Sequence, residues 1–359
     1  MRVAILGTRG IPNYHGGFEQ FAEFFGKYLV ENNHETYVYC SSLHPYQKSI
    51  WNDINLIHQT DPENRIGTSG QFIYDLNCIL DSRSRNFDVI FQLGYTSSSI
   101  WSKLLPKGAK IITNMDGLEW KRSKYNKMVQ KFLMYAEKLA VDNSDILIAD
   151  SIGIQEYLKE KYNVNSKYIA YGVNPKNTFN DSVLADYQLQ KDNYDLLIAR
   201  MEPENNIEVI LDGFVRSKMK TKFVVVGKTD NGFGKYLVNK FKEYSNILFL
   251  GGVYDMGKLN SLRKNSNLYF HGHSVGGTNP SLLEAMVSDT LICAHDNVFN
   301  RSILEENGFY FSNETDVSNL IKERNKVDYT DMVKRAHLIV LKKFSWQKIN
   351  KEYLSLLDE

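Results

Sequence analysis

The stretch that most constrains the fold is residues 267–286, which run from a short apolar strand through a glycine-rich loop into a helix. The strand is expected at residues 268–270 and the loop at residues 271–278. Asn279 is a favourable helix cap, and Pro280 suits a first helical turn, where a missing N–H costs nothing. A strand, loop and helix in this order form the repeating unit of a parallel α/β sheet, whose loops gather at the carboxyl edge.

This unit also predicts a binding site. The loop and the first helical turn present backbone amides and the positive end of a helix dipole, which bind phosphates in α/β proteins. Glu284 lies one turn inside the helix, where a carboxylate is a poor phosphate ligand but a good acceptor for two sugar hydroxyls. A ligand whose phosphate binds the amides and whose ribose binds Glu284 is a nucleotide. An ordinary crossover helix with a solvent-facing Glu284 is equally compatible with these residues.

Length and charge restrict the class of protein. A chain of 359 residues is long for one hydrophobic core, so we expect two domains. Lys and Arg number 43 against 42 Asp and Glu, which gives no indication of a nucleic-acid partner. Cys40, Cys78 and Cys293 are widely separated, so neither a disulfide framework nor a metal cluster is indicated. With no signal-like start and no apolar run of roughly 18 residues, we expect a cytoplasmic protein, at most attached to a membrane surface.

The first half opens with a strand at residues 2–6 and a loop that ends in Gly16 and Gly17, directly before a helix with apolar residues at helical spacing. Glycines in this position allow a close backbone approach and leave the helix N-terminus open to an anion. The pattern is not G-x-G-x-x-G, and the next strand, at residues 36–39, does not end in an acid. Both points disfavour NAD or FAD.

Strand and helix signals then alternate, with strands expected at residues 55–57, 88–93 and 110–114. This alternation predicts a parallel sheet with helices on both faces. Asp116 and Glu119 follow the last of these strands, at the edge where such sheets place their sites. They are candidates for a general base or a ligand of an acceptor hydroxyl. The alternatives are a helix-capping Asp116 and a surface Glu119.

Residues 121–138 predict a helix in which basic and aromatic residues are interleaved. The basic residues are Lys121, Arg122, Lys124, Lys127, Lys131 and Lys138. Such a helix can lie on an anionic membrane surface. A solvated face above a stripe of core residues explains the pattern as well.

Residues 174–192 are polar and lack periodicity, which predicts an interdomain linker between a first domain at 1–173 and a second at 193–343. The final segment, 344–359, is expected to be a helix that returns to the first domain. Its apolar stripe consists of Trp346, Ile349, Tyr353 and Leu356.

The second domain begins a new sheet. Its first strand, at residues 195–199, leads directly into Arg200, and the next, at residues 222–227, leads into Lys228. The planar guanidinium of Arg200 suits a diphosphate, although a surface ion pair is the simpler explanation.

Together these features resemble the GT-B glycosyltransferases of family 4, retaining enzymes that use a nucleotide-sugar donor and have two Rossmann-like domains facing a cleft. The resemblance covers nearly the whole chain. It rests on the Gly16 and Gly17 loop, on Arg200 with the Pro-Glu-Asn after it, on the Glu284 helix and on the Phe-Ser-Trp that ends at Trp346.

Three strings, at residues 7–12, 116–122 and 271–281, are similar to a narrower group. This group contains bacterial rhamnosyltransferases that transfer L-rhamnose from dTDP-β-L-rhamnose during polysaccharide assembly. Their acceptors are often GlcNAc or glucose on a lipid diphosphate.

The resemblance implies a role for each candidate residue. Gly16, Gly17 and Arg200 contact the donor diphosphate, and Glu284 binds the ribose. The other implied donor-site residues are Lys228, His273, Ser274, Gly276, Gly277, Thr278 and Asn279. Asp116, with Glu119 nearby, orients or deprotonates the acceptor. Arg200 and the loop amides stabilise the leaving group, so no metal or other cofactor is expected.

Some positions depart from the family pattern. Gly276 stands eight positions before Glu284, where the family has an acidic residue, and Asn205 stands where it has a lysine. Asp116 takes the place of a histidine found in many members. Other functions therefore stay open: transfer from a UDP-hexose or GDP-sugar, 2-epimerisation of a sugar nucleotide, and non-catalytic binding of nucleotide sugars by a scaffold protein.

Overall fold

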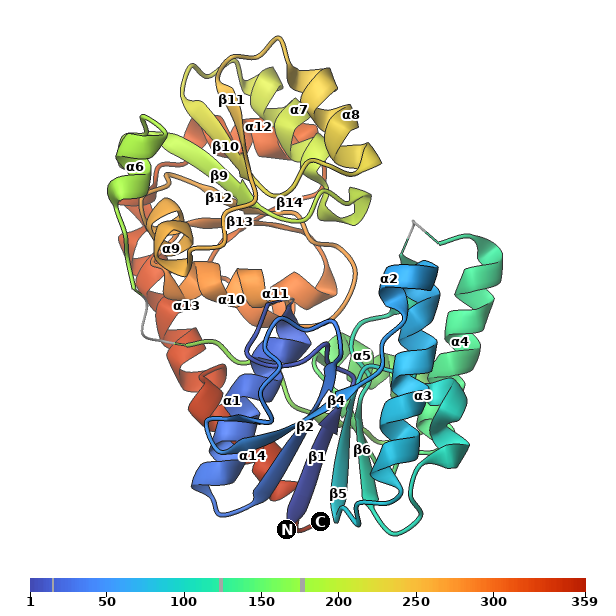
Figure 1. Cartoon of the computed structure of the whole chain (residues 1–359). Coiled ribbons are helices and arrows are strands. Elements are labelled where there is room, and N and C mark those ends of the chain that lie inside the picture. Colours follow the sequence, from blue (N-terminus) through green and yellow to red (C-terminus); the bar gives the residue numbers. More distant parts are fainter. Residues whose placement is uncertain (15, 123–124, 175–177) are drawn as a thin grey trace. The chain divides into compact units, whose positions relative to one another are not determined.

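The computed structural model in Figure 1 describes residues 1–14, 16–122, 125–174 and 178–359. The chain divides into two compact units. The first consists of Met1–Tyr171 with Trp346–Glu359, and the second of Gly172–Ser345. Each unit has its own mainly parallel sheet covered by helices, which confirms the predicted pair of Rossmann-like domains.

The sheet of the first unit has its earliest strand near the middle. In pairing order its strands are β3 (Ile50–Trp51), β4 (Ile54–Gln59), β2 (Glu35–Ser41), β1 (Arg2–Leu6), β5 (Val89–Leu93), β6 (Lys110–Asn114), β7 (Ile146–Ala149) and β8 (Lys167–Tyr168). Only β3 and β4 pair antiparallel among the described strands. Consecutive β1 residues are fully buried, as expected for a parallel strand covered on both faces.

The helices of the first unit are α1 (Gly17–Glu31), α2 (Glu63–Ile66), α3 (Gly70–Ser82), α4 (Lys127–Asp142), α5 (Ile152–Tyr162) and α14 (Trp346–Ser355). Short 3₁₀ turns lie at η1 (Gly67–Ser69), η2 (Ser99–Leu104) and η3 (Glu119–Lys121). Figure 1 shows α1 and α14 on one side of this sheet and α3 and α4 on the other.

The last helix, α14, returns to the first unit, as the sequence predicts. Trp346 stacks on Phe24 of α1 with ring centroids 4.8 Å apart, and Tyr353 packs against Phe21 at 4.6 Å. The side-chain amide of Asn350 donates a hydrogen bond to the carbonyl of Phe24 at 3.1 Å. The apolar stripe of the tail is therefore part of the first hydrophobic core.

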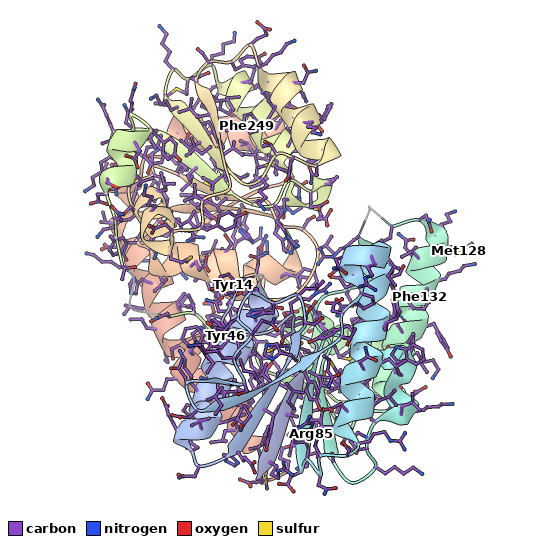
Figure 2. The ribbon with its side chains drawn as sticks, in the orientation of Figure 1. Tyr14, Tyr46, Arg85, Met128, Phe132 and Phe249 are labelled. Carbon is purple, nitrogen blue, oxygen red and sulfur yellow. The ribbon has the colours of Figure 1, made fainter. Side chains whose placement is uncertain are left out.

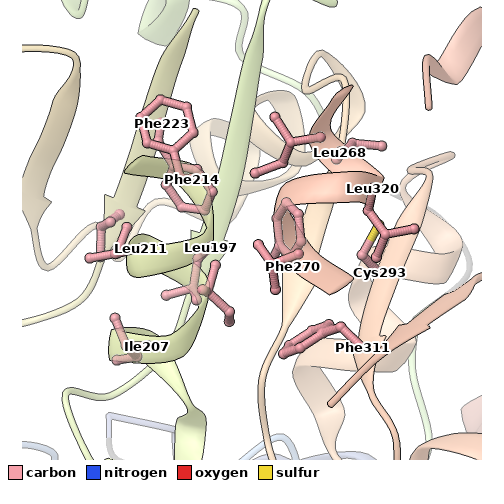
Figure 3. Packing of buried hydrophobic residues seen from close by; sticks show 14 of the residues in the cluster. Leu197, Ile207, Leu211, Phe214, Phe223, Leu268, Phe270, Cys293, Phe311 and Leu320 are labelled. Atoms are coloured by element: carbon pink, nitrogen blue, oxygen red, sulfur yellow. The ribbon is translucent and has the colours of Figure 1, made fainter. Parts of the chain in front are cut away.

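The second unit contains an all-parallel sheet. In pairing order its strands are β11 (Ile247–Gly251), β10 (Lys222–Val226), β9 (Tyr194–Ile198), β12 (Tyr269–His271), β13 (Ile292–His295) and β14 (Phe309–Phe311). Its helices are α6 (Ser182–Asp186), α7 (Ile207–Ser217), α8 (Gly232–Phe241), α9 (Met256–Lys264), α10 (Pro280–Val287), α11 (Val298–Leu304), α12 (Glu314–Glu323) and α13 (Thr330–Lys343), with η4 (Pro203–Asn205) and η5 (Lys326–Tyr329). Figure 3 shows part of its core, in which Phe223 packs against Phe214 and Phe270.

The segment at 174–192 is not the irregular linker that the sequence predicts. It contains α6, whose Val183 is fully buried, and it belongs to the second unit. The backbone N–H of Asn180 donates to Ser261 Oγ at 2.8 Å, which fixes the segment next to α9. One buried valine in so short a helix leaves no periodic signal. Residues 175–177 of the expected linker lie outside the described residues.

The helix expected at 121–138 begins later. Asn126 accepts hydrogen bonds from the N–H groups of Met128 and Val129, and this cap starts α4 at Lys127. Figure 2 shows Met128 and Phe132 on α4; Met128 is 81% exposed, whereas Phe132 packs against Phe72. Lys124 lies outside the described residues. No helix in the described part of the chain is long and apolar enough to cross a membrane.

Candidate active site

The first unit contains a cavity of about 300 Å³ where β1, β5 and β6 end at their carboxyl edge. Its lining comes from the loops that follow these strands and from the facing residues of α1 and α3. Asp116 and Glu119 both line it. The structure thus brings the two predicted acceptor residues to one cavity, and their catalytic roles stay predictions.

Asp116 and Glu119 are held by neighbours in sequence. Asp116 has a left-handed backbone with φ of 50°, and its N–H donates to Asn114 Oδ1 at 2.8 Å. Glu119 Oε1 lies 2.5 Å from Arg122 Nη2. The loop after β6 therefore presents one carboxylate from a turn and another that is already paired with a cation.

The cavity also contains Glu19 and Asp75, two carboxylates that the sequence interpretation missed. Glu19 Oε1 accepts a hydrogen bond from the N–H of Arg9 at 2.7 Å. Asp75 accepts from Ser97 Oγ at 2.5 Å and from Gln71 Nε2 at 3.2 Å. Burial raises the pKa of Asp75 to about 6. A sequence signal existed, because Asp75 shares the helical spacing of buried Cys78 and Ile79 on α3.

Gly16 and Gly17 lie at the N-terminus of α1, as predicted. Gly16 has an extended φ of −179° and Gly17 is the first helical residue. A Cβ atom on Gly17 would meet the Tyr171 ring at an ordinary 3.5 Å, so packing does not require glycine there. Gly7 is different: its φ is 89°, and a Cβ would lie 2.3 Å from the carbonyl oxygen of Leu93. Gly7 lets the end of β1 approach β5 beside the cavity.

The second unit contains the predicted strand, glycine loop and helix, formed by β12, residues 272–279 and α10. Asn279 Oδ1 accepts from the N–H of Ser281 at 2.9 Å, and Pro280 is the first residue of α10. Gly276 has a φ of 113°, which side-chain-bearing residues rarely adopt. Gly277 follows it, and the Thr278 side chain is buried.

Glu284 on α10 is paired with Arg263 of α9, a residue that the sequence interpretation missed. Arg263 Nη2 lies 2.6 Å from Glu284 Oε2, and the side chains are 1% and 19% exposed. Arg263 Nη1 also lies 3.3 Å from Asn260 Oδ1. The carboxylate is therefore fixed from one side, unlike that of a solvent-facing glutamate on a crossover helix.

Asn205, which stands where the resembled family has a lysine, connects two loops of this unit. Its Nδ2 donates to the carbonyl of Arg200 at 2.8 Å, and its Oδ1 lies 3.0 Å from His273 Nδ1. Ser274 Oγ donates to the carbonyl of Glu204 at 2.8 Å. A Cβ on Gly272 would lie 1.9 Å from the Asn205 carbonyl oxygen, so the two loops pack with backbone against backbone.

Arg200 and Lys228 are exposed residues that follow β9 and β10, which are neighbouring strands of this sheet. Lys228 Nζ lies 5.6 Å from the centre of the Tyr254 ring. Among the described residues no group of three or more His, Cys, Asp and Glu side chains is arranged to hold a metal ion. Independence from metals stays a prediction.

Comparison with known proteins gives a family match for each half of the chain and a fold match for the whole. Residues 184–336 match the model of glycosyl transferases group 1, and residues 1–174 match a domain of unknown function, DUF1972. The sucrose-phosphate synthase from Thermosynechococcus elongatus has the same two-domain fold, with a TM-score of 0.82 over 99% of this chain and 98% of that one, at 16% identity. The chain has the GT-B fold, and its second unit matches the model of group 1 glycosyl transferases.

Other GT-B proteins match over their full length. HepE from Anabaena, solved with UDP and glucose, has a TM-score of 0.76 and 16% identity over 100% of this chain and 99% of that one. A glycosyltransferase from Rickettsia africae has a TM-score of 0.69 and 16% identity over 99% of this chain and 97% of that one. At these identities the likeness establishes the GT-B fold. No curated protein sequence matches this chain significantly.

Proposed function

We propose that this GT-B protein is a retaining glycosyltransferase that moves a sugar from a nucleotide-sugar donor to a saccharide acceptor. The observation that carries the proposal is Glu284, fixed by Arg263 one turn inside α10, behind a capped helix N-terminus and the Gly276 loop. Amides and helix dipole suit a diphosphate, and the carboxylate suits ribose hydroxyls. HepE, solved with UDP and with UDP-glucose, has the same fold.

The proposed chemistry is displacement at the anomeric carbon of the donor sugar. The bond from this carbon to the diphosphate oxygen breaks, and a bond to the acceptor oxygen forms on the same face. Negative charge grows on the leaving phosphate, where Arg200, Lys228 and the amides of residues 274–278 stabilise it. The hydroxyl proton passes to a phosphate oxygen, while Asp116 orients the acceptor.

For the donor we propose dTDP-β-L-rhamnose. The support is the similarity of residues 7–12, 116–122 and 271–281 to rhamnosyltransferases of polysaccharide assembly. Gly276 is compatible with a 6-deoxysugar donor, because this chain lacks the acidic side chain that the resembled family has at that position near the donor sugar. A UDP-hexose is the second candidate, supported by the HepE structure with UDP-glucose.

For the acceptor we propose GlcNAc or glucose on a lipid diphosphate, met at the cytoplasmic face of a membrane. The support for the membrane contact is the start of α4, where Lys127, Met128 and, one helical turn later, Lys131 are exposed. Flotation with anionic liposomes tests this contact. Salt-sensitive binding that falls when both lysines are replaced by glutamine is expected, and absence of binding at low salt contradicts it.

Substitutions in the second unit test the function itself. Arg200→Ala and Glu284→Gln are each expected to lower kcat/KM at least about 100-fold, because each removes a contact to the donor. Arg216→Ala on α7, an exposed arginine that lies 3.8 Å from Glu314, is the matched control and retains activity. Full activity in both site variants contradicts the proposal. Donor binding without product from any acceptor favours the scaffold, and interconversion of sugar nucleotides without an acceptor favours the epimerase.

A further inference from the structure

The cavity of the first unit offers mainly hydrogen-bond acceptors. The hydroxyl hydrogen of Ser97 is engaged by Asp75, and that of Ser98 points to the carbonyl of Gly94 at 3.4 Å. Gln71 also donates to Asp75. A carboxylate has about four acceptor positions, and Asp75 uses two of them inside the protein. Its remaining positions suit a ligand that donates hydrogen bonds.

Glu19 has an acceptor atom without a partner among the described residues. The residue is only 5% exposed, and its Oε1 accepts from the N–H of Arg9. Its Oε2 has no hydrogen-bond partner among the residues that the structure describes, and Glu19 lines the cavity. A carboxylate oxygen without a donor from the protein can accept a hydrogen bond from a ligand in the cavity.

The charge of the cavity is negative. Arg9 is the only cation among its lining residues, all of which are described, and they include four carboxylates: Glu19, Asp75, Asp116 and Glu119. The Arg9 guanidinium is already paired with two further carboxylates, Asp61 at 2.9 Å and Glu63. Among the described residues, the carboxylates in and behind the lining outnumber their cation partners, which are Arg9 and, at Glu119, Arg122. An anion that enters is therefore repelled.

We infer that this cavity binds the acceptor through an uncharged, hydroxyl-rich sugar ring and rejects rings that carry a phosphate. The inference rests on the proposed function and names the acceptor class of the first unit. The volume of about 300 Å³ is at the lower end for ligand pockets, which suits a single sugar residue. Ring hydroxyls donate to Glu19 and Asp75, whereas a phosphate ester offers acceptors and charge where the site needs donors. The diphosphate of a lipid-linked acceptor then stays outside the cavity.

The test is a ligand-observed NMR titration of the whole protein with glucose and GlcNAc, each against its 6-phosphate, at constant ionic strength and with saturating dTDP or UDP. The neutral sugar is expected to bind at least about tenfold more tightly than its phosphate. Glu19→Gln and Asp75→Asn are each expected to weaken binding of the neutral sugar and to reduce the ratio of its affinity to that of its 6-phosphate, because each replaces a charged acceptor. Glu31→Gln, an exposed position at the end of the same α1, leaves the ratio unchanged.

The outcomes separate this inference from the proposed function. Equal affinity for neutral and phosphorylated sugars, no binding of either neutral sugar, or a ratio unchanged in both variants overturns the inference. The thermal unfolding midpoint of each variant shows whether it is folded. If Asp75→Asn does not fold, the comparison is made with Glu19→Gln alone. Nucleotide affinity, measured in the same samples, reports on the second unit. If the unaltered protein binds neither dTDP nor UDP, the proposed function is contradicted.

Discussion

Arg263 Nη2 lies 2.6 Å from Glu284 Oε2, and the arginine side chain is almost completely buried. Guanidinium stays charged at every accessible pH, so it holds the Glu284 carboxylate in one orientation. Oε2 is occupied by this contact. Oε1 is therefore the atom that we assign to the ribose hydroxyls.

The first prediction concerns this pair. Arg263→Ala is expected to raise the KM for the donor at least about tenfold and to lower stability by about 3 kcal/mol, because it leaves Glu284 without its charge partner. Arg263→Lys is expected to raise the KM less than Arg263→Ala does, since lysine keeps the positive charge but lacks the planar set of N–H donors of the guanidinium. Steady-state kinetics and urea unfolding measure both. An unchanged KM in a folded Arg263→Ala variant shows that Arg263 has no positioning role.

The second prediction concerns Glu137, a carboxylate buried behind the loop of Asp116 and Glu119. Its donors are Tyr157 at 2.7 Å, Tyr162 at 2.7 Å, Lys161 at 2.9 Å, Trp120 at 3.2 Å and Tyr95 at 3.4 Å. Glu137→Gln is expected to cost about 3 kcal/mol, because Lys161 loses its charge partner and the neutral amide accepts fewer hydrogen bonds. Glu160→Gln, exposed on α5, is the control. Equal unfolding midpoints for the two variants contradict the prediction.

The third prediction is a pH dependence at Asp195 in β9. Burial raises the pKa of Asp195 from 3.8 to about 7, so the folded state holds this proton more tightly than the unfolded chain does. The contribution of Asp195 to the free energy of unfolding is fully present below pH 3.8 and is lost as the pH rises to about 7. Asp195→Asn removes the ionisation and is expected to gain about 2 kcal/mol over the unaltered protein at pH 8, but little at pH 4. The prediction is contradicted if the free energies of unfolding of the unaltered protein and Asp195→Asn differ by the same amount at every pH in this range.

The fourth prediction concerns the returning helix. Trp346 is 4% exposed and lies against Phe24 and Tyr171 with ring centroids 4.8 and 4.9 Å away. Trp346→Ala is expected to lower the stability of the first unit by about 3 to 5 kcal/mol through loss of buried surface and a cavity. Leu338→Ala on α13, at a side chain 62% exposed, is the control and changes stability little. Denaturant unfolding distinguishes the two.

Features encoded by neighbouring residues were predictable from the sequence. The alternation of strands and helices, the cap at Asn279 and the apolar stripe on α14 depend on spacing within one or two turns, and the structure has all of them. The sequence placed Asp116 and Glu119 at a carboxyl edge because the end of a parallel strand determines that position.

The remaining site features depend on partners far apart in the chain. Arg263 and Glu284 are 21 positions apart, and Ser97 and Asp75 are 22 apart on different elements. No local pattern identifies such a pair. Asn205 illustrates the same limit: the sequence showed only the absence of a lysine, whereas the structure shows an amide that joins the Arg200 and His273 loops.

The measurement that tests the account most directly is a donor panel. The unaltered protein is incubated with dTDP-rhamnose, UDP-glucose, UDP-GlcNAc or GDP-mannose, each with a GlcNAc-diphosphate-lipid, and the lipid is analysed by mass spectrometry. The account predicts a product heavier by one deoxyhexose residue, formed from dTDP-rhamnose and lost in Glu284→Gln. A hexose product would replace rhamnose with another donor sugar. No transfer from any of these donors, by protein that binds their nucleotides, would contradict glycosyl transfer to this acceptor as the function.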